Sequence, residues 1–407
     1  MTAIILRNPP EAYDGSDGGF TVLRRRIHRL APFLLAACSS RPLPETPKET
    51  SIAEAPRELG PLQQDMYQVA SHVLELQSLM VRSEAEPKSS ALRAEVDSQL
   101  ASIESALSHA KTLKHLEGAP YQISARSLIA HVKEARLSNR NGAEDYARWM
   151  IQSIPTACAS CHAQQPHSPR PIWEVRGEQL EGNALQRAEI LFATRNYAEA
   201  LALYEAELLR EARSSKPNEI AVQTALRRTL MIDLRVRRDL NAARRRIEAY
   251  LRESPLSMRN AELFDWRTSL KRLAQRSIPT DASRRVEWIG SENRKRGGGL
   301  DIPQALYYSG LLLEALPQLS KDNDRALALY EIGSAEEALK LDYFFGYSRA
   351  YWRACLDQYP NVPAARSCYE ALEASLRELY SGSRGYEAPD EVTQELRRYR
   401  RRLNLDR

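Results

Sequence analysis

The chain has 407 residues, 43% of them hydrophobic, so it is long enough for two or three domains with a substantial core. The formal net charge is only +5, because 58 Lys and Arg residues are set against 53 Asp and Glu residues, and this balance argues against a dedicated nucleic-acid binder. The segments between prolines and glycines are rich in Ala, Leu, Arg and Glu, and few runs alternate as strands do. We therefore expect an all-α fold.

The N-terminal region has the residue order of a secretory signal. A basic stretch at 24–29 precedes a short apolar run at 30–37, and Cys38 follows. The run is too short to cross a bilayer, which needs about 20 apolar residues. The motif LAAC that ends at Cys38 resembles the lipobox of bacterial lipoproteins, in which the cysteine is lipidated and anchors the protein; the alternative is a buried cysteine after a short apolar helix. By the sorting rule of that family, Ser39 favours the outer membrane.

Residues 1–38 are thus assigned as a signal segment. Its first 20 residues match no signal pattern, so either the true start lies near Thr21 or the basic region is preceded by an unusually long extension. Residues 39–59 are rich in Pro, Ser, Thr and Glu and cannot bury enough apolar surface to fold, which predicts a disordered tether.

Residues 60–165 contain four stretches with helical periodicity. Apolar side chains recur at steps of three and four in 62–80 and 92–107, a third stretch follows Gly118, and a fourth opens near Glu144. Pro155 lies inside the fourth stretch and is expected to kink the helix or to start a new turn. Four helices joined by short loops predict a four-helix bundle.

The motif Cys158-Ala159-Ser160-Cys161-His162 lies at the end of the fourth predicted helix. A thioredoxin-like dithiol needs a βαβ setting, which the sequence lacks, and a structural zinc site needs four ligands, where only lone histidines lie nearby. A c-type haem requires CxxCH, because the two thiols add to the haem vinyl groups and the histidine binds the iron. An exported protein can acquire haem in this way, so we expect haem c on Cys158 and Cys161 with His162 as an axial ligand.

A predicted bundle with CxxCH on its last helix resembles the class II cytochromes c, the cytochrome c′ and c556 family. In low-spin members the first helix supplies a methionine, often followed six residues later by a histidine. The stretch DMYQVASH contains Met66 and His72 in this order, so the resemblance implies Met66 as the second axial ligand of the iron; ordinary core filling is the alternative. Residues 163–169 lack the aromatic and Arg that often follow the motif in that family. Without Met66 the iron could bind a small gas.

Residues 181–407 form a second helical region after a linker at 166–180. In 195–212 and 238–255, small and aromatic residues occupy positions that resemble the tetratricopeptide repeat, and looser matches follow at 324–341 and 351–376. The residues that carry this resemblance are Ala188, Ala200, Tyr204, Ala243, Ile247 and Pro255. Repeat arrays present a concave surface to a partner, so the resemblance implies peptide or protein binding. The alternative is an irregular helical domain.

The two remaining cysteines, Cys355 and Cys368, flank the predicted helix–helix turn YPNVP. Antiparallel helices place such positions opposite each other, and in an exported protein we expect a disulfide; the alternative is two separately buried thiols.

These features together predict a lipid-anchored periplasmic c-type cytochrome that transfers one electron and docks a partner through its helical repeats. A haem-based gas or redox sensor and a scaffold for envelope protein assembly are the alternatives. Residues 180–407 show no nucleophile with its base, no glycine-rich phosphate loop and no His or carboxylate spacing for a metal, and an enzyme is not expected. The expected partners are a redox protein and a protein bound by the repeats, and no nucleic acid.

Overall fold

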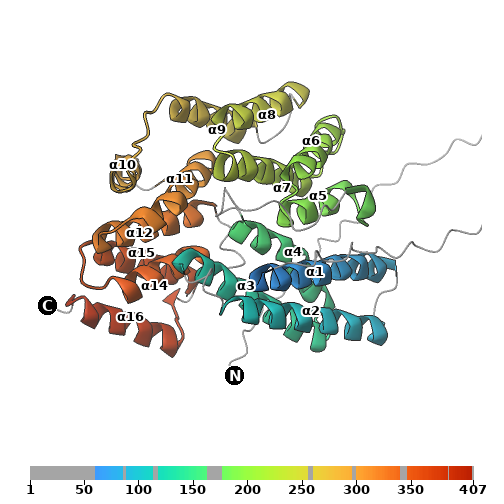
Figure 1. Cartoon of the computed structure of the whole chain (residues 1–407), viewed down its shortest axis with the longest axis horizontal. Coiled ribbons are helices and arrows are strands. Elements are labelled where there is room, and N and C mark those ends of the chain that lie inside the picture. The colour runs from blue at the N-terminus through green and yellow to red at the C-terminus, as the bar shows by residue number, and fades with distance from the viewer. Residues whose placement is uncertain are drawn as a thin grey trace, which may run out of the picture. The chain divides into compact units, whose positions relative to one another are not determined.

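The computed structural model describes residues 60–85, 89–112, 118–162, 177–254, 260–295, 299–339, 346–383 and 385–405. In these residues the protein is all-α, with fifteen α-helices, short 3-10 and π segments and one two-stranded hairpin (Figure 1). All of these described residues belong to one compact unit. The predicted signal segment with Cys38 and the tether at 39–59 lie outside the described residues. Among the described helices, none combines the length and apolar character needed to cross a membrane.

The first four helices begin where the sequence supplies start signals. Helices α1 (Pro61–Ala85), α2 (Ser90–Ala110), α3 (Ala119–Arg140) and α4 (Glu144–His162) follow one another, and each packs against the next. Pro61 and Pro120 lie in first turns, where the missing N–H groups have no helical partner to lose. The side chain of Ser89 accepts a hydrogen bond from the N–H of Leu92 at 3.3 Å and caps α2. Glu144 and Asp145 place negative charge at the N-terminus of α4.

Helix α4 continues through Pro155, so the new turn that was the alternative to a kink at this residue is wrong. Proline removes one helical hydrogen bond, the one to the carbonyl of Ile151. The buried side chains of Ile151, Ile154 and Ala157 pack into the core on both sides of Pro155 and hold the helix together. The CxxCH motif therefore occupies the last turn of one uninterrupted helix.

The remaining elements follow in chain order. The helices are α5 (Ala184–Ala193), α6 (Tyr197–Ala212), α7 (Glu219–Leu230), the π-helix Met231–Val236, α8 (Leu240–Glu253), α9 (Asn260–Ala274), α10 (Ala282–Lys295), α11 (Ile302–Ala315), α12 (Asp322–Leu339), α14 (Tyr347–Gln358), α15 (Ala364–Leu379) and α16 (Asp390–Arg402). Short 3-10 segments lie at Gly177–Gln179 and Leu316–Gln318, and β1 (Ser381–Gly382) pairs antiparallel with β2 (Gly385–Tyr386).

One hydrophobic core extends through all of these helices. Its members run from Val69 on α1 to Tyr399 on α16, and helix α4 packs on α5 while α3 packs on α14. Among the positions that resemble a tetratricopeptide repeat, Ala188, Ala200, Tyr204, Ala243 and Ile247 are fully buried, and Pro255 lies outside the described residues. Burial at these positions is compatible with repeats and with an irregular helical domain alike.

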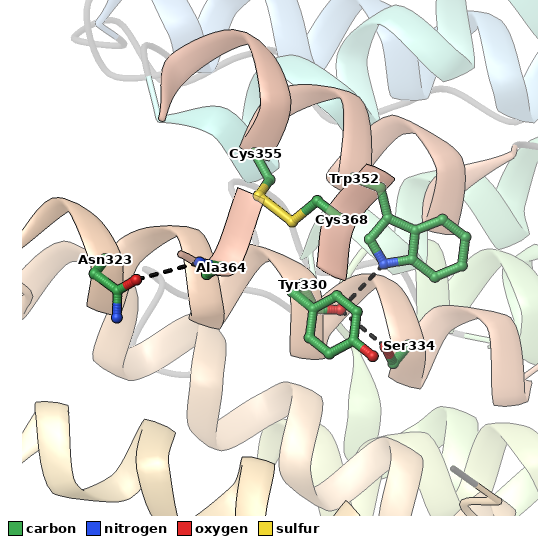
Figure 2. Close-up of a disulfide and its surroundings, with 7 residues drawn as sticks. All are labelled: Asn323, Tyr330, Ser334, Trp352, Cys355, Ala364 and Cys368. Carbon is green, nitrogen blue, oxygen red and sulfur yellow. Dashed lines mark hydrogen bonds between the residues drawn. A yellow bond between two sulfur atoms is a disulfide. The ribbon is translucent and has the colours of Figure 1, made fainter. Parts of the chain in front are cut away.

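Helices α14 and α15 are joined by a disulfide between Cys355 and Cys368, whose Cα atoms are 6.4 Å apart (Figure 2). The predicted turn separates the two helices, and the backbone N–H of Ala364 donates to Oδ1 of Asn323 at 3.3 Å. The indole N–H of Trp352 donates to the backbone carbonyl of Tyr330 on α12 at 3.2 Å, so α14 is tied to the preceding helix as well (Figure 2).

Candidate functional site

The CxxCH motif lies in the last turn of α4, where helical spacing places Cys158, Cys161 and His162 on one side of the helix. The two cysteines are free thiols rather than a disulfide. All three side chains are half-buried, and Cys158 packs against the hydrophobic core. The last turn of the helix therefore presents two thiols and an imidazole together.

The imidazole of His162 is oriented by the turn between α5 and α6. Its Nδ1 lies 2.5 Å from the backbone carbonyl oxygen of Ala193. A carbonyl can only accept, so Nδ1 carries the proton and Nε2 carries a free lone pair. A hydrogen bond from the far ring nitrogen to a carbonyl is a common support for a histidine that binds a metal.

Burial keeps the three groups of the motif neutral. It raises the pKa of the Cys158 thiol to about 12 and that of the Cys161 thiol to about 11, and the positive charge of Arg195 opposes the second shift. Burial, assisted by Arg195, lowers the pKa of His162 to about 3. A dithiol used in thiol–disulfide exchange has a lowered thiol pKa, so these cysteines do not suit that chemistry. A neutral imidazole suits iron binding.

Polar side chains from the helices that follow the motif surround it. Arg195 and Tyr197 come from the start of α6 and the turn before it. Burial raises the pKa of Tyr197 to about 12, Arg195 opposes the shift and Cys161 adds to it, so these three groups are neighbours. Tyr351 of α14 is almost fully buried, and its pKa is raised by burial and by Glu336, with smaller effects of Arg235 and Cys161.

Several polar atoms in this neighbourhood have no hydrogen-bond partner in the described structure. They are Nε of Arg195, the hydroxyls of Tyr197 and Tyr351, Nε and Nη1 of Arg235, and Oε2 of Glu336. Arg235 and Glu336 form a buried ion pair through a single 2.5 Å contact between Nη2 and Oε1. Buried polar groups are normally satisfied, so a cluster of unsatisfied ones calls for an explanation.

A second polar network ties the turn of α4 before the motif to the following helices. Arg228 on α7 forms an ion pair with Glu189 on α5 at 2.9 Å and donates to the hydroxyl of Thr156 on α4. The hydroxyl of Tyr204 on α6 donates to the same carboxylate at 2.5 Å. Hydrogen bonds to later helices therefore fix α4 at two points, Thr156 before the motif and His162 at its end.

Met66 is half-buried on α1 and packs against the core, and α1 contacts α4. The other described histidines have protein partners. Nδ1 of His72 lies 2.6 Å from Oε1 of Gln99, and His109 contacts the carboxylate of Asp65 at 2.7 Å. His131 is buried, with Nε2 2.8 Å from the carbonyl oxygen of Met150. Within the described ranges no three His, Cys, Asp or Glu side chains gather as a metal site would require.

Sequence reasoning identified the motif but missed the residues around it. Arg195, Tyr197 and Tyr351 carry no local signal, because they are distant from the motif in the sequence. Arg235 does carry a local signal, because it stands between apolar residues in the segment MIDLRV. A charged residue in such a run is rarely buried without a partner.

The donor set fits a covalently bound haem. The motif supplies two unpaired thiols at the spacing that haem attachment needs and an imidazole whose Nε2 is free to bind iron. The unsatisfied arginine and tyrosine donors nearby suit a group that carries carboxylates.

Comparisons of the chain with family models, with curated proteins and with solved structures give no match.

Proposed function

We propose that the protein is a c-type cytochrome of the bacterial periplasm, anchored by lipid at Cys38 to the outer membrane. In this proposal residues 60–165 form a class II-like four-helix bundle, and residues 181–407 form a tetratricopeptide-like array that docks a partner. The observation that carries it is the hydrogen bond between Nδ1 of His162 and the carbonyl of Ala193, beside two free thiols.

Each residue of the motif has a defined task in this proposal. Cys158 and Cys161 hold the haem through thioether bonds; in each, the sulfur bonds to a vinyl carbon and the thiol hydrogen moves to the adjacent carbon, with no net oxidation. His162 presents Nε2 to the iron, and Ala193 fixes the ring. When bound, the haem supplies reversible one-electron transfer at its iron. The electron is exchanged with a redox protein. A protein bound by the helical repeats brings this redox partner close to the haem.

The test is expression of the full chain in the periplasm together with haem-maturation machinery. We expect a coloured protein whose spectrum changes on reduction with dithionite and whose mass exceeds that of the lipidated polypeptide by one haem. The matched control is Cys158→Ala/Cys161→Ala, which keeps the helix and loses the colour. A colourless wild-type protein with the mass of polypeptide and lipid alone contradicts the proposal. Cys38→Ala tests the anchor separately, because it should release the protein from the membrane fraction.

A haem-based sensor is the second candidate, and one observation favours it. The imidazole of His162 is hydrogen-bonded directly to Ala193, the last residue of α5, so a change at the iron would reach the helices that follow. The two functions differ at Met66. If its thioether binds the iron, the spectrum is low-spin and Met66→Leu changes it, which supports electron transfer. If the wild-type iron is five-coordinate and binds carbon monoxide or nitric oxide, the sensor is favoured.

A further inference from the structure

The polar groups around the CxxCH motif carry more positive charge than the described structure neutralises. Arg195 has no carboxylate partner in the described residues. Arg235 pairs with the carboxylate of Glu336 through one nitrogen only, and its Nε and Nη1 have no partner there. A buried donor without a partner costs about 1–3 kcal/mol, and more when it is charged. Arg235 is only 1% exposed, so water does not relieve it.

Both arginines are presented by unusual backbone. Arg195 has a φ of 66°, in the left-handed region that residues other than glycine rarely occupy. Arg235 lies in the π-helix Met231–Val236, a conformation that is frequent at functional sites. The left-handed φ of Arg195 costs about 1–3 kcal/mol and persists where the surroundings enforce it. Arg195 follows by two positions the residue whose carbonyl contacts His162, and Arg235 is a neighbour of Tyr351, which is also near Cys161.

The missing partner has a defined chemistry. Arginine has a planar fork of donors that matches a carboxylate, and tyrosine hydroxyls add single donors to such a group. The unsatisfied atoms of Arg195, Arg235, Tyr197 and Tyr351 are all donors of these two kinds. A haem carries two propionate carboxylates, which need positive partners when they leave water.

We infer that Arg195 and Arg235, assisted by the hydroxyls of Tyr197 and Tyr351, bind the propionate carboxylates of the haem. The inference rests on the proposed function. It makes the helices after residue 181 part of the haem site in addition to any docking role. The carboxylates of the haem held by the CxxCH motif are thus neutralised by residues from the π-helix, from α14, and from the start of α6 and the turn before it.

The first test compares unfolding of the haem-loaded chain with that of the haem-free Cys158→Ala/Cys161→Ala chain, each with and without Arg195→Gly. Without haem, glycine removes an unsatisfied charge and a strained φ, so the melting temperature should rise. With haem, the same change leaves a carboxylate unpaired, so the melting temperature should fall. The matched control is Asn404→Gly, because Asn404 also has a left-handed φ, of 55°, but is exposed after the end of α16. This control should shift both forms in the same direction.

The second test measures the midpoint potential of the haem-loaded protein against pH and does not need a folded haem-free chain. The wild-type potential should be flat through the neutral range, whereas Arg195→Gly should add a pH-dependent step as the unpaired propionate titrates. Arg195→Lys should keep most of the wild-type profile and Asn404→Gly all of it. For Arg235, the double variant Arg235→Met/Glu336→Gln removes the ion pair without leaving a buried charge, and it should add the same step.

The outcomes separate the two proposals. A wild-type chain that takes up no haem overturns both. A chain that binds haem covalently, but whose Arg195→Gly variant shifts both forms alike and leaves the potential independent of pH, overturns only the assignment of the propionate partners.

Discussion

Nδ1 of His162 and the carbonyl oxygen of Ala193 lie 2.5 Å apart, which joins the last residue of α4 to the last residue of α5. The bond fixes the tautomer of the imidazole, because only Nδ1–H can donate to a carbonyl. The orientation of the proposed iron ligand is therefore set by a backbone atom outside the predicted bundle, and no side-chain substitution can remove that acceptor.

This relationship can be tested with free ligands. In the haem-loaded protein, His162→Gly should lose the histidine-ligated spectrum and regain it when imidazole is added. N-Methylimidazole binds iron but has no second N–H to donate, so it should restore the spectrum at a clearly higher concentration than imidazole. Absorption titrations of both ligands measure the difference, and mass spectrometry confirms that the haem remains attached. Equal concentrations for the two ligands would show that Ala193 does not support the ligand.

The ion pair between Arg228 and Glu189 should stabilise the attachment of α4 to the following helices. The side chains of Arg228 and Glu189 are only 8% and 14% exposed, and Arg228→Met leaves the carboxylate buried and short of a partner. We expect a loss of about 3 kcal/mol in the free energy of unfolding, measured by denaturant titration. Arg228→Met/Glu189→Gln should recover most of it. The exposed pair Arg366–Glu370 provides the control, since Arg366→Met should change stability by less than about 0.5 kcal/mol. A loss that persists in the double variant would assign the effect to packing.

Hydrophobic periodicity was sufficient to predict the helices. The stripes at 62–80 and 92–107 lie inside α1 and α2, because residues that repeat every three or four positions share the face that packs on a neighbour. At Pro155 the local preference of proline predicted a kink or a new turn, but α4 continues through this residue. Packing of Ile154 and Ala157 outweighs one lost hydrogen bond, and a sequence read locally does not reveal that packing.

The motif could be predicted from the sequence and its surroundings could not. Cys158, Cys161 and His162 form a pattern within five residues, whereas Arg195 and Tyr351 reach the site through tertiary packing. The left-handed φ of Arg195 has no sequence signature, because such conformations are usually marked by glycine or asparagine. One hydrophobic core includes helices from both sides of the linker predicted at 166–180.

The disulfide between Cys355 and Cys368 should stabilise the chain by restricting its unfolded state. Closing a loop of this length contributes roughly 3 kcal/mol in the chain-entropy model. We expect dithiothreitol to lower the melting temperature of the wild-type protein and to leave that of Cys355→Ala/Cys368→Ala unchanged. Cys158→Ala/Cys161→Ala serves as the control, because it keeps this bridge and should respond to the reductant as the wild type does. Equal melting temperatures with and without reductant in the wild type would count against the bridge.

Glu331 on α12 should make folding stability depend on pH. Its side chain is buried and accepts a hydrogen bond from the amide of Asn293. Burial raises its pKa from the ordinary value of 4.5 to about 7, although Asn293 and Arg294 oppose the shift. The folded state therefore binds this proton more tightly than the unfolded state. As pH rises from about 4.5 to about 7, the folded chain must release the proton at a cost, so this residue lowers stability across that window and fully above it.

Glu331→Gln removes this titration while its side-chain carbonyl can still accept from Asn293. Relative to wild type, the variant should gain little stability near pH 4, because there the side chain of Glu331 is largely neutral in the folded state and in the unfolded state. Its advantage should grow through the window and reach about 3 kcal/mol above pH 7, because each unit of pKa shift corresponds to about 1.4 kcal/mol. Denaturant titrations at a series of pH values measure this difference directly. Glu370→Gln, at an exposed position on α15, should show no such growth. A constant difference between wild type and Glu331→Gln at all pH values would mean that Glu331 has the same pKa in the folded and unfolded states, so that its burial is compensated by charges beyond Arg294.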